Sequence, residues 1–315
     1  MRGCVALTVD ELGAERWDAF CADSSGAWFF HTSRWLAYQR ARGGEDWSFA
    51  LLDGDRIVAA CPVMLEHGAG GSSFSMDGHP CPWPAFRNHL GLASSRRVAE
   101  EVAHTIALKA LELRVSYAFR TGPFTGGGVP LPQMQITNGW STRVTDLTAP
   151  AEELHAGLRK SYTSIVNAGM RRWEFLDGIG GPEARSAVEI AERLHAKAAG
   201  RKTRPTKTWE MMADWAVAGD AVCLVARRQD QGAVGFAYFL IHKRHAYYAS
   251  AAALEPNVGH ALLWAGILKL KGAGVRRLEI GWQGQAEDKK GRNVEHFKAG
   301  FPGTDVPILV AERRL

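Results

Sequence analysis

The chain has 315 residues, of which 46% are hydrophobic and 23% charged, and its formal net charge is +5. This composition is that of a globular protein with room for two domains, and the charge is too small to imply nucleic acid by itself. No window approaches the roughly 18 uncharged apolar residues of a membrane span, and Met1-Arg2-Gly3 opens no signal peptide. We therefore expect a cytoplasmic protein with no membrane insertion.

The first half of the chain starts with Thr8-Val9-Asp10-Glu11, a capping box that predicts a helix. The elements predicted after it are a helix from Ser33 to about Arg42, strands 47–52 and 56–65 joined at Asp53-Gly54, a strand near Phe74, a helix from Ser94 to about Arg114 and a strand 115–119. In the second half the predicted elements are helices 150–175, 183–199 and 207–218, strands 221–227, 233–242 and 245–251 with a turn at Asp230-Gln231-Gly232, a helix 259–271 and a strand 277–282.

Both halves repeat the order helix, helix, hairpin, strand, helix, strand. This repetition predicts an α/β (α+β) fold of two tandem units with mixed sheets, residues 1–135 and 145–315. The break falls where Gly126-Gly127-Gly128 and three prolines crowd one short region. A single Rossmann-type domain is disfavoured, because no G-x-G-x-x-G follows the first strand.

The five cysteines (Cys4, Cys21, Cys61, Cys81, Cys223) are scattered and never paired as C-x-x-C. An odd, unpaired set argues against a disulfide framework and a structural zinc site. We expect mostly buried thiols and no metal.

Basic residues gather in one region: residues 159–208 hold eleven Lys or Arg and five Asp or Glu. On the helix predicted from Glu153 to Trp173, one side is apolar. The other side alternates cations with short hydroxyl and amide side chains, as oxygen-rich phosphate or sugar ligands require. The alternative is a solvated basic helix face. The loop 200–209 adds Arg201 and Arg204 before a helix start, which is either an anion site or a capped solvent loop.

The C-terminal region carries a lysine-bearing segment bounded by glycines. It opens at Asp288-Lys289-Lys290-Gly291-Arg292 and closes at Phe297-Lys298-Ala299-Gly300-Phe301. Because it follows the predicted strand 277–282, Lys298 can place a positive charge where an oxyanion forms; it can equally be a solvated loop lysine.

Four segments in order resemble the Fem-type aminoacyltransferases within the wider GNAT-like N-acyltransferases. They are 158–167 (Leu-Arg-Lys-Ser-Tyr-Thr-Ser-Ile-Val-Asn), 200–205 (Gly-Arg-Lys-Thr-Arg-Pro), 259–264 (Gly-His-Ala-Leu-Leu-Trp) and the lysine segment. The resemblance is strongest over residues 150–305 and implies two tandem GNAT-like units with a cleft between them. It implies transfer of an acyl or aminoacyl group to an amine on a nucleotide-linked sugar, a cell-envelope precursor or a related small molecule.

By this resemblance Lys298 supplies the positive charge and Phe297 orients the site. Tyr248, on the predicted strand 245–251, is the candidate for proton transfer, because only one of Tyr247 and Tyr248 can face a given side. Gly259 and Ala261 match the GNAT turn that binds the cofactor pyrophosphate. Arg159, Lys160, Arg201 and Arg204 are expected to converge on phosphates. The remaining substrate-binding candidates are Ser161, Tyr162, Trp209, Asp288 and Lys289.

Two departures from the family pattern concern the donor and the acceptor. Pro256 stands where GNAT enzymes carry a cation or amide, which favours aminoacyl-tRNA over acyl-CoA as donor. The nearby basic residues of the 31–35 segment are Arg34 and Arg40, where cell-wall Fem enzymes often have a lysine for the acceptor. No tightly bound cofactor is expected, and the sequence does not set the oligomeric state. The alternatives are an acetyl-CoA-dependent enzyme acting on an amino sugar or small amine, and a catalytically silent module that binds a nucleotide or RNA.

Overall fold

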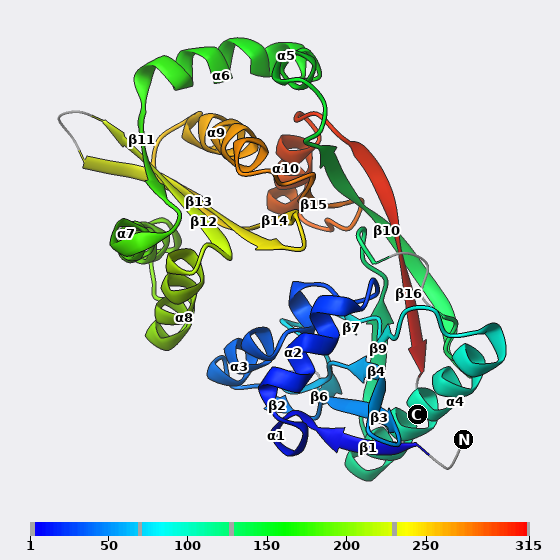
Figure 1. The fold of residues 1–315 in the computed structure, drawn as a ribbon. Coiled ribbons are helices and arrows are strands. Elements are labelled where there is room, and N and C mark those ends of the chain that lie inside the picture. The colour runs from blue at the N-terminus through cyan, green and yellow to red at the C-terminus, as the bar shows by residue number, and fades with distance from the viewer. Residues whose placement is uncertain (1–3, 69–70, 126–128, 229–231, 314–315) are drawn as a thin grey trace. The chain divides into compact units, whose positions relative to one another are not determined.

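The chain forms two compact units (Figure 1), and the computed structural model describes residues 4–68, 71–125, 129–228 and 232–313. Unit 1 holds the chain up to Gly139 and again from Pro307, whereas unit 2 is Trp140–Val306. The expected second domain therefore differs at its end, because the last strand pairs with a strand of unit 1. Glycines 126–128 of the expected linker, and Asp230 and Gln231 of the expected turn, lie outside the described residues.

Unit 1 opens with a short strand that the sequence did not predict, followed by the expected capping box. The Oγ1 of Thr8 accepts from the Glu11 N–H at 3.2 Å, and the Glu11 carboxylate accepts from the Thr8 N–H at 2.8 Å. The elements of this unit are β1 (Val5–Thr8), α1 (Val9–Leu12), α2 (Ala14–Asp23), a 3₁₀ turn (Phe29–His31), α3 (Ser33–Ala41), β2 (Glu45–Asp46), β3 (Phe49–Asp53), β4 (Arg56–Cys61), β5 (Met64–Gly68), β6 (Gly71–Phe74), β7 (Cys81–Pro82), β8 (Ala85–Phe86), α4 (Leu92–Leu113) and β9 (Ser116–Arg120).

The strands of unit 1 form two groups around one apolar core. One group has the order β1-β3-β4-β8, and the other joins β9 to β6, β5 and β2, with β7 also on β9. The predicted hairpin at Asp53-Gly54 is confirmed, since Asp53 pairs with Arg56 and Gly54 has φ +61°. Large buried side chains such as Trp17, Phe49 and Phe119 fill the core.

Two strands carry the chain between the units: β10 (Gln135–Asp146) leads into unit 2, and β16 (Thr304–Arg313) leads back. Unit 2 itself consists of α5 (Ala151–Ala156), α6 (Lys160–Arg172), β11 (Glu174–Gly178), α7 (Gly181–Ala199), α8 (Thr206–Val217), β12 (Ala221–Arg228), β13 (Gly232–His242), β14 (His245–Ala253), α9 (Val258–Gly272), β15 (Arg277–Gln283) and α10 (Lys289–Lys298).

The sheet of unit 2 has the order β11-β12-β13-β14-β15-β10, and only the β14–β15 pair is parallel. Residues 221–226 and 234–240 are buried without alternation, which is typical of strands covered on both faces. Helices α7 and α8 cover one face and α9 the other, with α6 outside α9 (Figure 1). Helix α9 is apolar all round because it packs between the sheet and α6.

The two-unit α/β fold with mixed sheets is confirmed, and the structure differs from the sequence analysis at three places. The single helix predicted across 153–173 is two helices, because the chain turns at Gly157 and restarts with Arg159 as the N-cap of α6. The lysine segment is helix α10 rather than a loop. Strands β10 and β16 were not predicted.

All five cysteines are free thiols, and four of them are buried, as expected for core thiols. Within the described residues, no helix is both long and apolar enough to cross a membrane.

Candidate active site

Strands β14 and β15 pair along only part of their length, and this opens the sheet of unit 2. The parallel pairing joins His245–Tyr247 to Arg277–Glu279. Beyond that, β14 runs on to Ala253 while β15 pairs with β10 up to Gln283. The opening lies toward the carboxyl ends of two parallel strands, where α/β folds place their ligands.

Lys298, the last residue of α10, lies against β15 just beyond this point. A Cβ built on Gly281 would lie 2.5 Å from Lys298 Nζ, so a larger residue there would displace the end of the lysine side chain. Gly281 also has φ +120°, in the region that L side chains rarely adopt. The register shifts at this point, with Arg143 paired to Gly281 and Val144 to Glu279, so Ile280 is the extra residue of a bulge in β15. The sequence therefore shapes β15 around the lysine side chain.

Two carboxylates act on the Lys298 ammonium. Burial lowers the pKa of Lys298 from its ordinary value, whereas the charges of Glu279 and Glu295 raise that pKa in part. Glu279 is only 2% exposed and accepts a hydrogen bond from Thr142 Oγ1 at 2.7 Å. Glu295 accepts from the N–H groups of Gln285 and Ala286. Lys298 is thus a largely desolvated amine whose charged form is favoured by two carboxylates.

Gln283 adds a second hydrogen-bond donor, besides Lys298, on β15 at the opening between β14 and β15. It lies two residues after Gly281 on β15, so both residues point to the same side of the sheet. Its Nε2 is buried and donates to no acceptor among the described residues. A buried amide without an acceptor is destabilising, and such groups are often kept for a ligand. Lys298 and Gln283 therefore offer two N–H donors on one side of β15.

An aromatic cluster of Tyr162, His260, Phe297 and Phe301 holds α10 against α6 and α9. The ring centroids lie 4.4 Å apart for Tyr162 and His260, and 4.9 Å apart for His260 and Phe297. Gly300 permits this packing, because a Cβ there would lie 2.1 Å from the Tyr162 ring. Phe297 and Tyr162 therefore belong to one cluster, which fixes the end of the helix that carries Lys298.

Arg159 lies at the edge of the aromatic cluster. Its backbone N–H donates to the Gly300 carbonyl at 2.9 Å, and its Nη1 lies 2.6 Å from His296 Nε2. Its guanidinium lies over the Tyr162 ring, 5.0 Å from the centroid. Burial and the Arg159 charge together lower the pKa of His260. The next residues, Lys160 and Ser161, are exposed on the first turn of α6.

Tyr248 is the first residue of β14 after the last parallel pair. Its ring packs against Phe239, 5.3 Å between centroids, and it borders the apolar core under α9. Burial raises the pKa of its phenol well above the ordinary value. Tyr248 is therefore a protonated phenol that can donate a hydrogen bond.

The first turn of α9 provides less for a cofactor than the sequence suggested. The Ala261 side chain is fully buried, and a Cβ on Gly169 of α6 would lie only 2.6 Å from it. The Ala261 N–H points to the Asn257 carbonyl at 3.4 Å. Gly259 lies beside the Phe297 ring. Ala261 therefore packs where α9 crosses α6. Of the two residues predicted to bind a cofactor, Gly259 remains the candidate.

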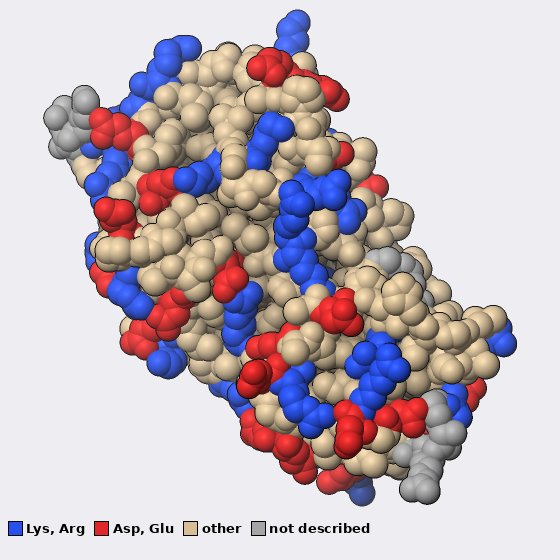
Figure 2. Space-filling view, in the orientation of Figure 1, with Lys and Arg blue, Asp and Glu red and all other residues tan. Residues whose placement is uncertain are grey.

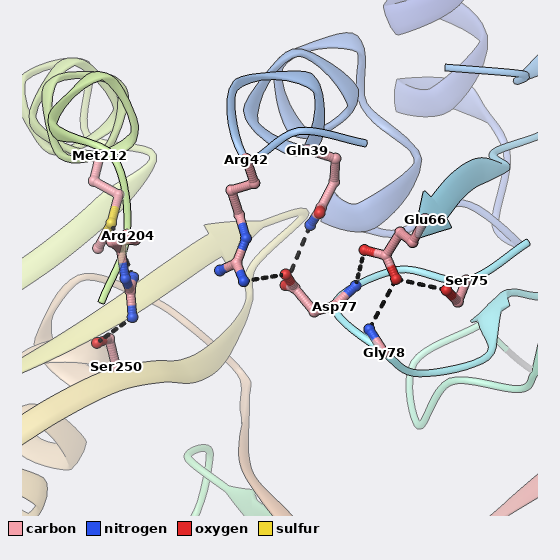
Figure 3. Close-up of polar contacts among 9 residues, drawn as sticks. All are labelled: Gln39, Arg42, Glu66, Ser75, Asp77, Gly78, Arg204, Met212 and Ser250. Carbon is pink, nitrogen blue, oxygen red and sulfur yellow. Dashed lines mark hydrogen bonds and ion pairs between the residues drawn. The ribbon is translucent and has the colours of Figure 1, made fainter. Parts of the chain in front are cut away.

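The four predicted phosphate-binding cations do not converge. Arg204 reaches Ser250 Oγ at 3.3 Å and Met212 Sδ at 3.6 Å, and it lies over the Trp209 ring on the α7–α8 face (Figure 3). Arg159 lies on the opposite face, beside α6 and α10. Arg201 is exposed in the loop before α8. The single phosphate site predicted for these cations is therefore wrong, because the sheet separates them.

Trp209, predicted to bind substrate, is a core residue. It is 4% exposed and packs against His195 and Phe236. Asp288 caps α10, its Oδ1 accepting from the Gly291 N–H at 2.6 Å, and Lys289 is exposed on the first turn. Among the described residues, no three His, Cys, Asp or Glu side chains gather as a metal site.

No family model and no curated protein matches the chain, but solved structures do. FemX superposes with a TM-score of 0.65 at 10% identity, over 97% of this chain and 96% of FemX. L-PGS from Bacillus licheniformis gives 0.62 at 12% identity, over 96% and 92%. A conserved protein of unknown function from Bacteroides thetaiotaomicron gives 0.59 at 10%, over 99% of both chains.

The chain has the Fem-like GNAT fold. The resemblance stated from the sequence motifs is thus confirmed at the level of the fold. Sequence reasoning missed Glu279, Gly281 and Gln283, although an acid and a glycine within the apolar strand Leu278-Glu279-Ile280-Gly281 are an unusual signal.

Proposed function

We propose that this protein is an N-acyltransferase that moves an acyl or aminoacyl group from a carrier to an amine. The observation that carries the proposal is the Lys298 ammonium, held beside Gly281 at the opening between β14 and β15. In a Fem-like fold this opening is the expected place for the donor carbonyl. A partly desolvated cation fixed there stabilises negative charge more strongly than one in water.

In the proposed reaction a neutral amine attacks the donor carbonyl, forming a C–N bond and a tetrahedral oxyanion. Lys298 Nζ and Gln283 Nε2 donate to this oxyanion. Its collapse breaks the bond between carbonyl carbon and carrier oxygen or sulfur. The amine loses one proton and the carrier gains one, so the net reaction needs no further reagent. Tyr248, whose phenol is protonated at neutral pH, is the candidate proton donor to the leaving group.

For the acceptor we propose a phosphate-bearing or nucleotide-linked amine, such as a cell-envelope precursor, that contacts the start of α6. Arg159 and the exposed Lys160 and Ser161 lie together there. Arg159 is already positioned by His296 and Tyr162, which reduces the entropy lost when it binds an anion. Arg204, on the other face of the sheet, is not part of this contact.

For the donor we propose aminoacyl-tRNA rather than acyl-CoA. The first turn of α9 carries no Lys or Arg, and Phe297 packs beside Gly259. A CoA pyrophosphate would therefore find few groups to neutralise it at this turn. Acyl-CoA remains the second candidate because the opening between β14 and β15 suits either donor.

The test measures transfer by the purified chain, with aminoacyl-tRNA and acetyl-CoA as separate labelled donors and amino-sugar nucleotides as acceptors. Lys298→Ala should lower kcat by about 10²–10³-fold with little change in KM, since the ammonium acts mainly in the transition state. A silent binding module would show no turnover with either donor. An unchanged kcat for Lys298→Ala would remove the lysine from the mechanism.

The matched control is Lys290→Ala, which removes an exposed lysine from the first turn of the same helix. It should retain both kcat and KM. A raised KM with normal kcat for Lys298→Ala would show that the lysine binds substrate and does not stabilise the oxyanion. The melting temperature of each variant separates these outcomes from loss of folding.

A further inference from the structure

A pocket of about 550 Å³ lies in unit 2 between α7 and the strand ends, and the proposed reaction makes no use of it. We call it the α7 pocket. Its charged lining is Arg193 and Lys197 from α7, Arg227 and Arg228 from the end of β12, and Glu174 from the start of β11. The volume is within the range of about 300–1,000 Å³ that small-molecule sites occupy.

The α7 pocket combines this charge with apolar walls. Ile190 and Leu194 are four residues apart on α7 and so share one side of the helix, as do Arg193 and Lys197. Leu254, from the end of β14, adds to the apolar lining. A ligand that fits this lining has both an anionic part and an apolar part.

Most of the cations here are not neutralised by the protein. Arg228 pairs with Glu255 at 3.0 Å and lies over the Trp173 ring, so it is fixed in place. Arg193, Lys197 and Arg227 form no ion pair with any residue in the described part of the chain, although Glu174 lies directly opposite Arg227 across the β11–β12 pair. Glu174 is the one acid among the lining residues. Like charges gathered without partners repel one another, and a bound anion relieves that repulsion.

The charges that line the α7 pocket are mixed, because Glu174 lies among the four cations. On the face drawn in Figure 2, basic and acidic side chains are interspersed over the helices and strands of unit 2. A nucleic acid would follow a continuous basic stripe, whereas a few cations around an apolar hollow suit a small ligand. Arginine also recognises phosphate oxygens through two parallel hydrogen bonds.

The geometry points to the α7 pocket as a binding site for a small phosphorylated molecule whose apolar part rests on Ile190, Leu194 and Leu254. Arg193, Lys197 and Arg227 bind its phosphate groups. The site lies on the α7 side of the sheet, whereas Arg159 lies on the α9 side. It does not depend on the proposed acyl transfer.

The test is calorimetric titration of the full chain with adenosine 5′-diphosphate, inorganic pyrophosphate and adenosine. ADP should bind more tightly than pyrophosphate, because only ADP covers the apolar walls, and adenosine should bind far more weakly than either. Arg193→Ala and Lys197→Ala should each weaken ADP binding by about three- to tenfold. Glu174→Gln should tighten it by about twofold, because it removes the acid from the lining.

Arg185→Ala is the matched control, since Arg185 is an exposed arginine on the same helix that pairs with Asp214 outside the pocket. It should leave the ADP affinity unchanged, as should Lys298→Ala. The proposal is overturned if neither phosphate probe binds, if adenosine binds as tightly as ADP, or if pyrophosphate equals ADP. It is also overturned if Arg159→Ala, rather than Arg193→Ala, abolishes binding.

Discussion

Two opposing electrostatic effects act on the pKa of Lys298. Desolvation at the end of α10 disfavours its charged form, and the carboxylates of Glu279 and Glu295 favour it. The first effect is the larger, so the pKa lies below the ordinary value of 10.5. The ammonium is the active form in the proposed reaction, and it is lost as pH rises through this lowered pKa. Activity should therefore decline on the alkaline side before an exposed lysine titrates.

Replacing Glu279 tests this balance. Glu279→Gln keeps the shape and can still accept from Thr142 Oγ1, but it removes a charge that raises the Lys298 pKa. The Lys298 pKa should fall further, and the alkaline limb of the kcat profile should move to lower pH. The measurement is kcat against pH for both proteins. A limb that stays in place, or moves to higher pH, contradicts the electrostatic coupling of Glu279 to the lysine.

Gln283 gives a second prediction at this scale. Because its buried Nε2 has no acceptor among the described residues, removing it should relieve an unfavourable desolvation of about 1–3 kcal/mol. Gln283→Met should therefore keep or raise the melting temperature while lowering kcat by about 10²-fold, the typical effect of losing an oxyanion donor. Gln285→Met, at the neighbouring half-buried glutamine, is the control. A fall in stability with unchanged kcat would make Gln283 a structural residue.

The sequence predicted some of these residues and not others for a physical reason. Phe297 and Lys298 stand out because an aromatic, a lysine and a glycine form a compact local motif. Glu279 accepts a hydrogen bond from Thr142, and Gln283 lies on the same side of β15 as Lys298. Both neighbours are remote in sequence, so no local motif reveals these two residues. In the sequence, Arg201 and Arg204 look like members of one phosphate site with Arg159. The sequence does not show that the sheet lies between them.

At the scale of elements, the close crossing of α6 and α9 supports the site. Gly169 of α6 faces Ala261 of α9 with no room for a further methyl group. Tyr162, on the same helix, packs into the aromatic cluster that carries Phe297. The distance between the helices therefore helps to set the position of α10 and of Lys298.

Gly169→Ala should destabilise unit 2 even though alanine is the better helix former. The gain in helix propensity is about 1 kcal/mol, whereas overpacking a core typically costs about 1–3 kcal/mol, and a Cβ contact of 2.6 Å is severe. The double variant Gly169→Ala/Ala261→Gly moves the methyl group to the other helix and should recover most of the stability. Urea unfolding of both variants decides the point. No recovery in the double variant would mean that the contact is not the cause.

Elements with local signals were predicted well, and those that depend on distant partners were not. The apolar runs of β12 and β13 and the helix α9 match the structure within a few residues. Strand β10 contains Asn138-Gly139, which usually marks a turn, and it is extended because it lies between two strands, β16 and β15, of which β15 pairs with Ser141–Asp146. The helix predicted across 153–173 kept its apolar stripe but broke near Gly157, where the Arg159 N–H bonds to Gly300.

At the scale of the whole molecule, the chain does not finish one unit before it starts the other. Unit 2 is inserted between the body of unit 1 and its last strand, so the two ends of the chain belong to one unit. The repeated order of elements does not reveal this insertion. The repeat shows that two units exist, but it does not show which strand completes the sheet of each unit. The pairing of β16 with β9 therefore had no signal in the sequence.

A chain that ends at Val306 tests this arrangement. It lacks the part of β16 that pairs Val310 with Arg120 and Ala311 with Phe119. It also removes the buried Ile308 and Val310, each worth about 1.5–3 kcal/mol of apolar burial. The amides of β9 should lose much of their protection from hydrogen exchange, while β12 and β13 of unit 2 keep theirs.

The control for this truncation is Leu309→Ser in the full chain. Leu309 is 45% exposed on the same strand, so this change keeps the ladder and should leave exchange in β9 nearly unaltered. Hydrogen exchange followed by mass spectrometry resolves peptides from the two units. Unchanged protection of β9 in the truncated chain would show that unit 1 is complete without its last strand. Equal loss in β12 and β13 would show that the units unfold together, because stability would then be shared and not local.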